Sequence, residues 1–217
     1  MGEAELNGLT GELIIRSVFY FYGESSSAPF ADLVAKDVED YWNEPRTSVI
    51  IHKKIYSVRF DITGIHEPAL KPETVWYNDD PKLNFFRIEQ YVIGNISFVD
   101  GIGSNTGYFK LDNLMQTSST AAHEYGHTIG LAHPDISDIR GGTGPGIMYP
   151  RGTLCEPHLQ YDPLAAAAAH GGFLDPQHRK VYPEDIQNLR LHTLEFNNKG
   201  YAKLGEFTSI YHEKHLQ

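Results

Sequence analysis

Three histidines and one glutamate stand at fixed offsets in the segment His123–His133, which reads HEYGHTIGLAH. On an α-helix, His123 and His127 would lie one turn apart on the same face. Two imidazoles at this spacing suit a zinc ion, whose bonds to histidine nitrogen are about 2.0–2.1 Å long. Glu124 is rotated by roughly 100° from His123, so it would reach a water on the ion and not the ion itself. The pattern predicts a zinc site with an acid–base group beside it.

The residues after His127 complete the expected ligand set. Gly130 follows His127 by three residues, and glycine adopts a positive φ at little cost, so the helix can end there with a sharp turn. That turn would bring His133 back to the same ion. Three protein ligands leave the fourth tetrahedral position to water, as in catalytic zinc sites. We therefore expect His123, His127 and His133 to bind one Zn²⁺ ion, with Gly130 supporting the site.

The chemistry that this arrangement predicts is hydrolysis of a peptide bond. Zinc lowers the pKa of a bound water from 15.7 toward about 7. Glu124 would take that proton as general base and pass it to the leaving amine as general acid. Two alternatives stay open: a zinc-binding interaction module without peptidase activity, and a zinc hydrolase that acts on a non-peptide amide.

A second motif, Ile147–Pro150 (IMYP), follows the histidines and places Met148 15 residues after His133. With it the chain resembles the metzincin metallopeptidases, and most closely their matrixin-like branch. The resemblance implies that Met148 forms a hydrophobic floor under the zinc ligands. It also implies that Tyr149 and Pro150 begin the wall of the pocket for the substrate residue after the scissile bond. Astacins and serralysins carry a tyrosine ligand two residues after the methionine; Pro150 stands there instead, so we expect no such ligand.

Two departures separate the chain from true matrixins. The link between the third histidine and the methionine is longer and contains the glycine-rich stretch Gly141–Gly146. The His-x-Asp pattern that accompanies a second zinc and a calcium loop in matrixins is missing. The cluster Asp100–Asn105 (DGIGSN) is compatible with a Ca²⁺ loop, but such clusters are usually turns. One catalytic Zn²⁺ is the expected cofactor, and Ca²⁺ has no further support.

Composition limits the class of partner. The net charge of −10 disfavours a nucleic-acid partner. No apolar run approaches the roughly 20 residues that span a membrane. The expected partner is a protein or peptide substrate, and the sequence leaves the oligomeric state open.

Compartment is indicated only indirectly. The N-terminal segment Met1–Asn7 has neither the basic nor the apolar region of a signal peptide. Cys155 is the single cysteine, so no disulfide can form within the chain. The family resemblance nevertheless favours a secreted, extracellular protein.

The elements that position the motif indicate an α+β (mixed α/β), zincin-like fold. We expect a twisted, mixed five-stranded sheet with two long helices, a zinc cleft and a smaller helical C-terminal subdomain. Runs rich in β-branched and aromatic residues predict strands at Gly11–Tyr22, two within Thr47–Ile65, one at Phe85–Ile96 and one at Tyr108–Leu111. Apolar residues from Phe30 to Trp42 recur at three- and four-residue steps and predict a helix that Pro45 ends.

One further strand would border the cleft. By the resemblance, the strand nearest the cleft runs antiparallel to the others and pairs with an extended substrate. The candidate for that edge is Asn95–Val99, which makes Asn95, Ile96 and Ser97 candidate residues of the substrate pocket.

The whole chain, 1–217, is expected to form one catalytic domain. Its upper subdomain would span about 11–133 and its lower subdomain about 134–195. The lower part carries helix patterns at Asp162–His170 and from Pro183 onward. Residues 196–217 exceed the family core and would form a terminal hairpin or an ordered tail.

Overall fold

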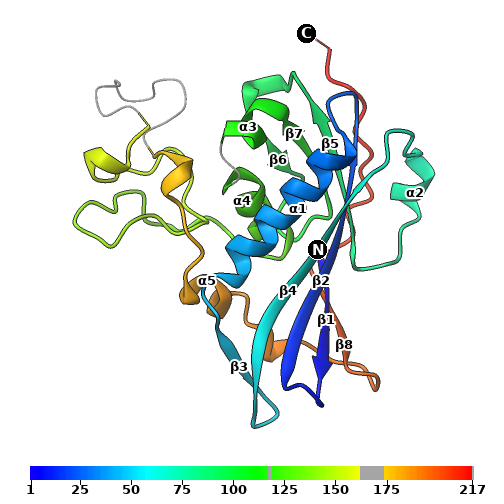
Figure 1. The fold of residues 1–217 in the computed structure, drawn as a ribbon, viewed down its shortest axis with the longest axis vertical. Coiled ribbons are helices and arrows are strands. Elements are labelled where there is room, and N and C mark those ends of the chain that lie inside the picture. The colour runs from blue at the N-terminus through cyan, green and yellow to red at the C-terminus, as the bar shows by residue number, and fades with distance from the viewer. Residues whose placement is uncertain (117–118, 162–173, 217) are drawn as a thin grey trace.

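The computed structural model describes residues 1–116, 119–161 and 174–216 and shows a mixed α/β fold with a curled sheet (Figure 1). Within these residues the sheet has eight strands, ordered β3-β4-β2-β5-β7-β6, with β1 paired to β2 and β8 paired to β1. The strands are β1 Gly2–Asn7, β2 Glu12–Tyr22, β3 Ser48–Ile51, β4 Lys54–His66, β5 Leu83–Glu89, β6 Phe98–Val99, β7 Thr106–Lys110 and β8 Tyr201–Leu204.

Strand β2 organises the sheet because both of its edges are occupied. One edge pairs in parallel with β4 along residues 12–21. The other edge is divided: residues 12–16 pair antiparallel with β1, and residues 18–22 pair in parallel with β5. Strand β7 continues in parallel from β5, and β6 pairs antiparallel with β7 at the end of the path. The mixed sheet that the sequence predicts is confirmed.

The expected strand count of five was wrong. Strands β1 and β8 were not predicted; they pair with each other and extend the sheet beside the first half of β2. The sequence of β1, GEAELN, alternates small or apolar residues with polar ones, which is the period of a half-buried strand, but five of its six residues are types with low β propensity. Its pairing with residues from the other end of the chain stabilises it as a strand.

The other strands follow their sequence patterns with shifted ends. Strands β3 and β4 confirm the two strands expected within Thr47–Ile65, and His52 and Lys53 turn between them with positive φ. Strand β5 ends at Glu89, although the prediction ran to Ile96. Asn95 lies in a short 3₁₀ turn, so the expected edge strand Asn95–Val99 is a strand only at Phe98 and Val99.

Helices α1 (Ala28–Asn43) and α4 (Ser119–Thr128) pack on the same face of the sheet. The Trp42 ring contacts Phe60 of β4, and so does the Tyr125 ring of α4. The Trp42 indole N–H also donates a hydrogen bond to the Ala122 carbonyl oxygen over 3.1 Å. Figure 1 shows α1 crossing the sheet beside α4. This contact fixes the helix that carries the histidines against the core.

The remaining described helices are short. They are α2 Pro72–Trp76, α3 Leu111–Gln116 and α5 Pro183–Asn188, with 3₁₀ turns at Ile93–Asn95, Pro157–Leu159, Pro176–His178 and Leu191–Thr193. The helix predicted from Pro183 is confirmed as α5. The helix predicted at Asp162–His170 lies outside the described residues. In the described part of the chain, no helix is long and apolar enough to cross a membrane.

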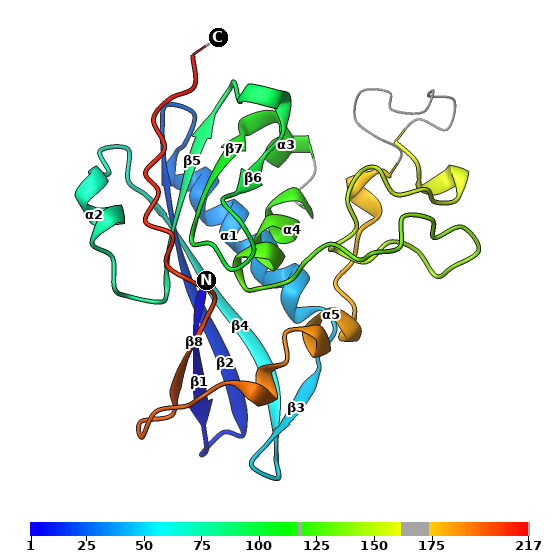
Figure 2. The same cartoon turned by 180° about the vertical axis from the view of Figure 1, so that it is seen from behind.

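The C-terminal segment is an ordered tail and not a hairpin. After β8 it runs in extended form beside β5, as Figure 2 shows. Arg87 of β5 donates a hydrogen bond to the His212 carbonyl oxygen over 3.1 Å. The backbone N–H of His215 donates to the Tyr108 hydroxyl oxygen of β7 over 3.0 Å. The tail therefore covers part of the sheet that borders β6.

Candidate metal centre

Helix α4 presents the first two histidines and ends as the sequence predicts. Gly130 has a φ of 108°, and no atom lies within 4 Å of the position that a Cβ would take there. The positive φ, and not a lack of space, is therefore what favours glycine. The N–H of Leu131 donates to the Gly126 carbonyl and the N–H of Gly130 to the His127 carbonyl. This pair of bonds is the Schellman arrangement, which a left-handed glycine permits. The turn sends the chain back toward the helix and brings His133 beside the other two imidazoles.

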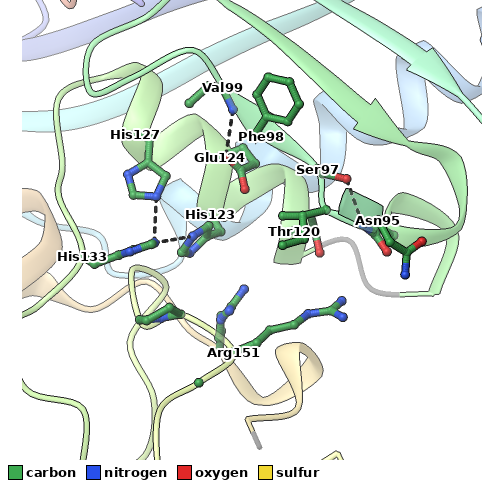
Figure 3. Close-up of a pocket in the computed structure, with 15 residues that line it drawn as sticks. Asn95, Ser97, Phe98, Val99, Thr120, His123, Glu124, His127, His133 and Arg151 are labelled. Carbon is green, nitrogen blue, oxygen red and sulfur yellow. Dashed lines mark hydrogen bonds between the residues drawn. The ribbon is translucent and has the colours of Figure 1, made fainter. Parts of the chain in front are cut away.

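The three imidazoles converge on one point (Figure 3). The Nε2 atom of His133 lies 3.1 Å from Nε2 of His123 and 3.0 Å from Nε2 of His127. The candidate ligand atoms of all three lie within 4.8 Å of one another. Two nitrogens on one tetrahedral zinc ion would be about 3.3 Å apart, given the usual bond length. The cluster therefore has the dimensions of a metal site.

Backbone carbonyls fix which nitrogen of each helix histidine is free. Nδ1 of His123 lies 2.7 Å from the Ile147 carbonyl oxygen, and Nδ1 of His127 lies 2.7 Å from the Leu131 carbonyl oxygen. A carbonyl only accepts, so each Nδ1 carries the proton and each Nε2 presents its lone pair. Burial lowers the pKa of His123 well below its usual value and also lowers that of His127, which keeps both rings neutral. Lone pairs that meet in this way attract a cation.

Glu124 lies on the wall of the same cavity. It is 8% exposed, and one of its carboxylate oxygens accepts a hydrogen bond from the Val99 backbone N–H of β6 over 3.2 Å. Burial raises the pKa of Glu124 to about 8, while the Val99 hydrogen bond and Arg179 act in the opposite direction. The carboxyl group is thus held by the edge strand and faces the space beside the histidines, where a bound cation would favour its ionised form.

Met148 lies underneath the helix. It is 3% exposed and belongs to the turn that the Tyr149 N–H closes onto the Gly146 carbonyl. A Cβ added to Gly126 would lie 2.2 Å from the Met148 sulfur. The methionine therefore packs directly on the backbone of α4, next to His127.

A cavity of about 470 Å³ joins these groups. Among the residues predicted for the substrate pocket, Asn95, Ile96, Ser97 and Pro150 line it, whereas Tyr149 does not. Its lining comprises Asn95, Ile96, Ser97, Phe98, Val99, Asn113, Thr120, His123, Glu124, His127, His133, Pro150, Arg151, Gly152 and Arg179. The segments around β6 and after Met148 thus form opposite walls.

Several residues of the site were not singled out from the sequence, and three of them bear on its chemistry or packing. Arg151 and Arg179 line the cavity, and Gly126 accommodates Met148. Arg151 directly follows the IMYP motif and was open to inference, whereas Arg179 is brought in by a distant segment with no pattern of its own. Gly126 carried a signal, because a glycine inside a helix usually has a packing reason.

The cluster Asp100–Asn105 gives no support to a Ca²⁺ loop. One oxygen of Asp100 accepts a hydrogen bond from the Thr106 hydroxyl over 2.5 Å and lies 2.8 Å from His212 Nε2. Within the described residues, the three histidines form the one group of three or more His, Cys, Asp or Glu side chains spaced to hold a metal ion.

Comparisons with known proteins add little. No protein-family model matches the chain, and no curated protein matches it. Among solved structures, the chain is similar to one described as "Structure of a chaperone-substrate complex", with 12% identity and a TM-score of 0.40 over 90% of this chain. The chain spans 32% of that protein's length. A likeness this distant carries no argument about fold or function.

Proposed function

We propose that the chain is a zinc-dependent endopeptidase of the metzincin kind. The observation that carries the proposal is the meeting of three imidazole Nε2 atoms beside the buried carboxylate Glu124. Binding of a metal alone would need only the histidines. Hydrolysis also requires a general base beside the cluster, and Glu124, which accepts a hydrogen bond from the Val99 N–H, is placed to be that base.

The donor set fits zinc better than harder cations. Neutral imidazoles suit zinc and other late transition metals, whereas Ca²⁺ and Mg²⁺ take oxygen ligands. When bound, zinc supplies a Lewis acid and a water of lowered pKa. The second hydrogen bonds of His123 and His127, to Ile147 and Leu131, hold these rings in the orientation that a ligand needs.

Glu124 moves the proton. In the proposed reaction it accepts a proton from the attacking water and later delivers it to the leaving nitrogen. The hydrogen bond from Val99 restricts the rotamers of Glu124, so the second carboxylate oxygen stays directed into the cavity. A positioned base of this kind contributes about 10²–10⁴-fold to a rate.

Strand β6 is the proposed guide for the substrate. It lies at the end of the described sheet, it runs antiparallel to β7, and both of its residues line the cavity. An extended peptide placed beside it would pass between Glu124 and the wall that Pro150 and Arg151 form.

Metal analysis combined with a peptide library tests this proposal. We expect one zinc per chain, cleavage within long peptides by the wild type, and no cleavage by Glu124→Ala with its zinc retained. A zinc-free purified protein that does not take up zinc contradicts the metal site. Stoichiometric zinc without cleavage favours the interaction module or a non-peptide amide substrate, and cleavage only at peptide ends contradicts an endopeptidase.

A further inference from the structure

Two arginines line the cavity on the side away from β6. Arg179 is 4% exposed, and Arg151 is partly buried; both belong to the segments that follow Met148. Figure 3 shows Arg151 across the cavity from Ser97 and Val99. Guanidinium groups in this position face whatever occupies the cleft.

Neither guanidinium has a partner among the described residues. Among the described residues, no acidic side chain lies within ion-pair distance of Arg151 or Arg179. No described side chain forms a hydrogen bond with either guanidinium group. The Nε atom of Arg179 is fully buried and has no hydrogen-bond partner. A buried cation without a partner is costly, so such groups usually bind an anion.

The nearby acids are engaged elsewhere. Glu124 acts on Arg179 through its charge, but its carboxylate accepts the Val99 N–H. Asp175 acts on Arg151, but its side chain accepts the Gln177 N–H over 2.9 Å. Burial and the charge of Arg151 lower the pKa of Arg179 to about 10, so both arginines are still charged at neutral pH.

We propose that Arg151 and Arg179 form a carboxylate-binding subsite beside the metal centre. Arginine presents a planar fork of N–H donors that matches a carboxylate. The anionic groups of an unmodified polypeptide are carboxylates, either on aspartate and glutamate side chains or at the C-terminus. As a statement about substrate, the inference rests on the proposed peptidase function: the enzyme selects peptides with a carboxylate next to the scissile bond.

A binding measurement tests the subsite without metal or catalysis. The full chain, freed of metal and held at pH 8 so that the histidines are neutral, is titrated with three probes. N-acetylglutamate α-amide carries only a side-chain carboxylate, N-acetylglycine only a terminal one, and N-acetylglutamine α-amide none. We expect one or both acids to bind and the neutral probe not to bind. The acid that binds identifies the source of the carboxylate.

Variants assign the binding to the two arginines. Arg151→Met and Arg179→Met should each weaken binding of the acid at least tenfold, and Arg179→Lys should retain part of it. Arg46→Met, at an exposed arginine outside the cavity, should bind like the wild type. Equal binding by wild type, Arg151→Met and Arg179→Met overturns the proposal. If Arg179→Met does not fold, Arg151→Met and Arg179→Lys apply the same criterion.

Cleavage of a peptide library by the zinc-loaded chain distinguishes a failure of the subsite proposal from a failure of the peptidase proposal. Acidic residues or free C-termini should be enriched at one position near the cut, and Arg151→Met should lose that enrichment through a higher KM for the acidic peptides. Cleavage without any acidic preference overturns the subsite alone. Acid probes that bind through the arginines, with no peptide cut, overturn the peptidase proposal alone. A fall in kcat for all peptides alike in Arg151→Met contradicts a selective role.

Discussion

Gly126 leaves no room for a side chain because the Met148 sulfur occupies the place where its Cβ would be, 2.2 Å away, with a Trp42 ring atom at 3.2 Å. The glycine sits on α4 between Glu124 and His127, and the methionine sits in the turn after Gly146. This contact lets the turn approach the helix closely enough for the Ile147 carbonyl oxygen to accept a hydrogen bond from the Nδ1–H of His123. Packing under the helix and ligand orientation are therefore coupled.

Gly126→Ala tests that coupling. Alanine favours a helix over glycine by about 1 kcal/mol, but the added methyl group overlaps the buried Met148 and should cost about 1–3 kcal/mol more. We expect a net loss of stability in urea unfolding and a weaker affinity for zinc. Gly8→Ala is the matched control, because Gly8 has open space around its Cβ position; it should unfold like the wild type.

The double variant Gly126→Ala/Met148→Ala separates overlap from other effects. Truncating Met148 removes the atom that the new methyl group meets, so the two losses in stability should sum to more than the loss in the double variant by about 1 kcal/mol. Strict additivity would show that the two side chains do not compete for one space.

Removal of the metal should destabilise the protein. An ion that binds the folded chain and not the unfolded chain adds about 4 kcal/mol to the free energy of unfolding when its concentration is 1,000 times its Kd. We therefore expect a chelator to lower the melting temperature and added zinc to restore it. His127→Ala should abolish the zinc response, while His158→Ala, at an exposed histidine outside the cavity, should keep it. A melting temperature that is the same with and without chelator argues against a bound metal.

Asp185 should make stability depend on pH. Burial raises its pKa from 3.8 to about 6, against the opposing hydrogen bond from the Tyr182 N–H over 2.8 Å. The folded state then binds more protons at Asp185 than the unfolded state between these values, so the contribution of this group to stability is full below pH 3.8 and is lost as pH rises through 6. Asp185→Asn cannot ionise and should gain about 2 kcal/mol on the wild type between pH 4 and pH 7.

Urea unfolding at several pH values measures this difference. Glu195→Gln, at an exposed acid, is the control and should follow the pH dependence of the wild type. Parallel curves for wild type and Asp185→Asn would mean that Asp185 ionises normally in the folded protein.

Cys155 should be unreactive in the folded chain. Its side chain is fully buried, its thiol donates toward the Leu159 carbonyl, and burial raises its pKa from the ordinary thiol value, so little thiolate is present at pH 8. We expect slow alkylation by iodoacetamide in buffer and rapid alkylation in denaturant. Equal rates in the two conditions would contradict the burial of this thiol.

The candidate site was predictable from the sequence to the extent that its geometry is local. Four-residue spacing places His123 and His127 on one helical face, and Gly130 alone explains how His133 returns to them. Apolar periodicity likewise predicted β2 and α1, whose patterns are long. In each case the residues that decide the structure are neighbours in the chain.

The remainder depends on contacts between distant segments. Strand β1 forms by pairing with β2 and with β8 from the other end of the chain, although most of its residues have low β propensity. Arg179 joins the cavity because the Gly146 segment pairs with Lys180 in an isolated bridge. The residue pattern of one segment does not predict which distant segment packs beside it, so these features could not be predicted from the sequence.

Peptide hydrolysis by the wild type and by Glu124→Gln, compared at equal zinc content, tests the central claim most directly. Glutamine keeps the size of the side chain and can accept the Val99 hydrogen bond, but it cannot take a proton. We predict one zinc in each protein, cleavage of internal peptide bonds by the wild type, and a rate at least 10²-fold lower in the variant. Equal rates in the two proteins, or no cleavage by the zinc-loaded wild type, would contradict the account.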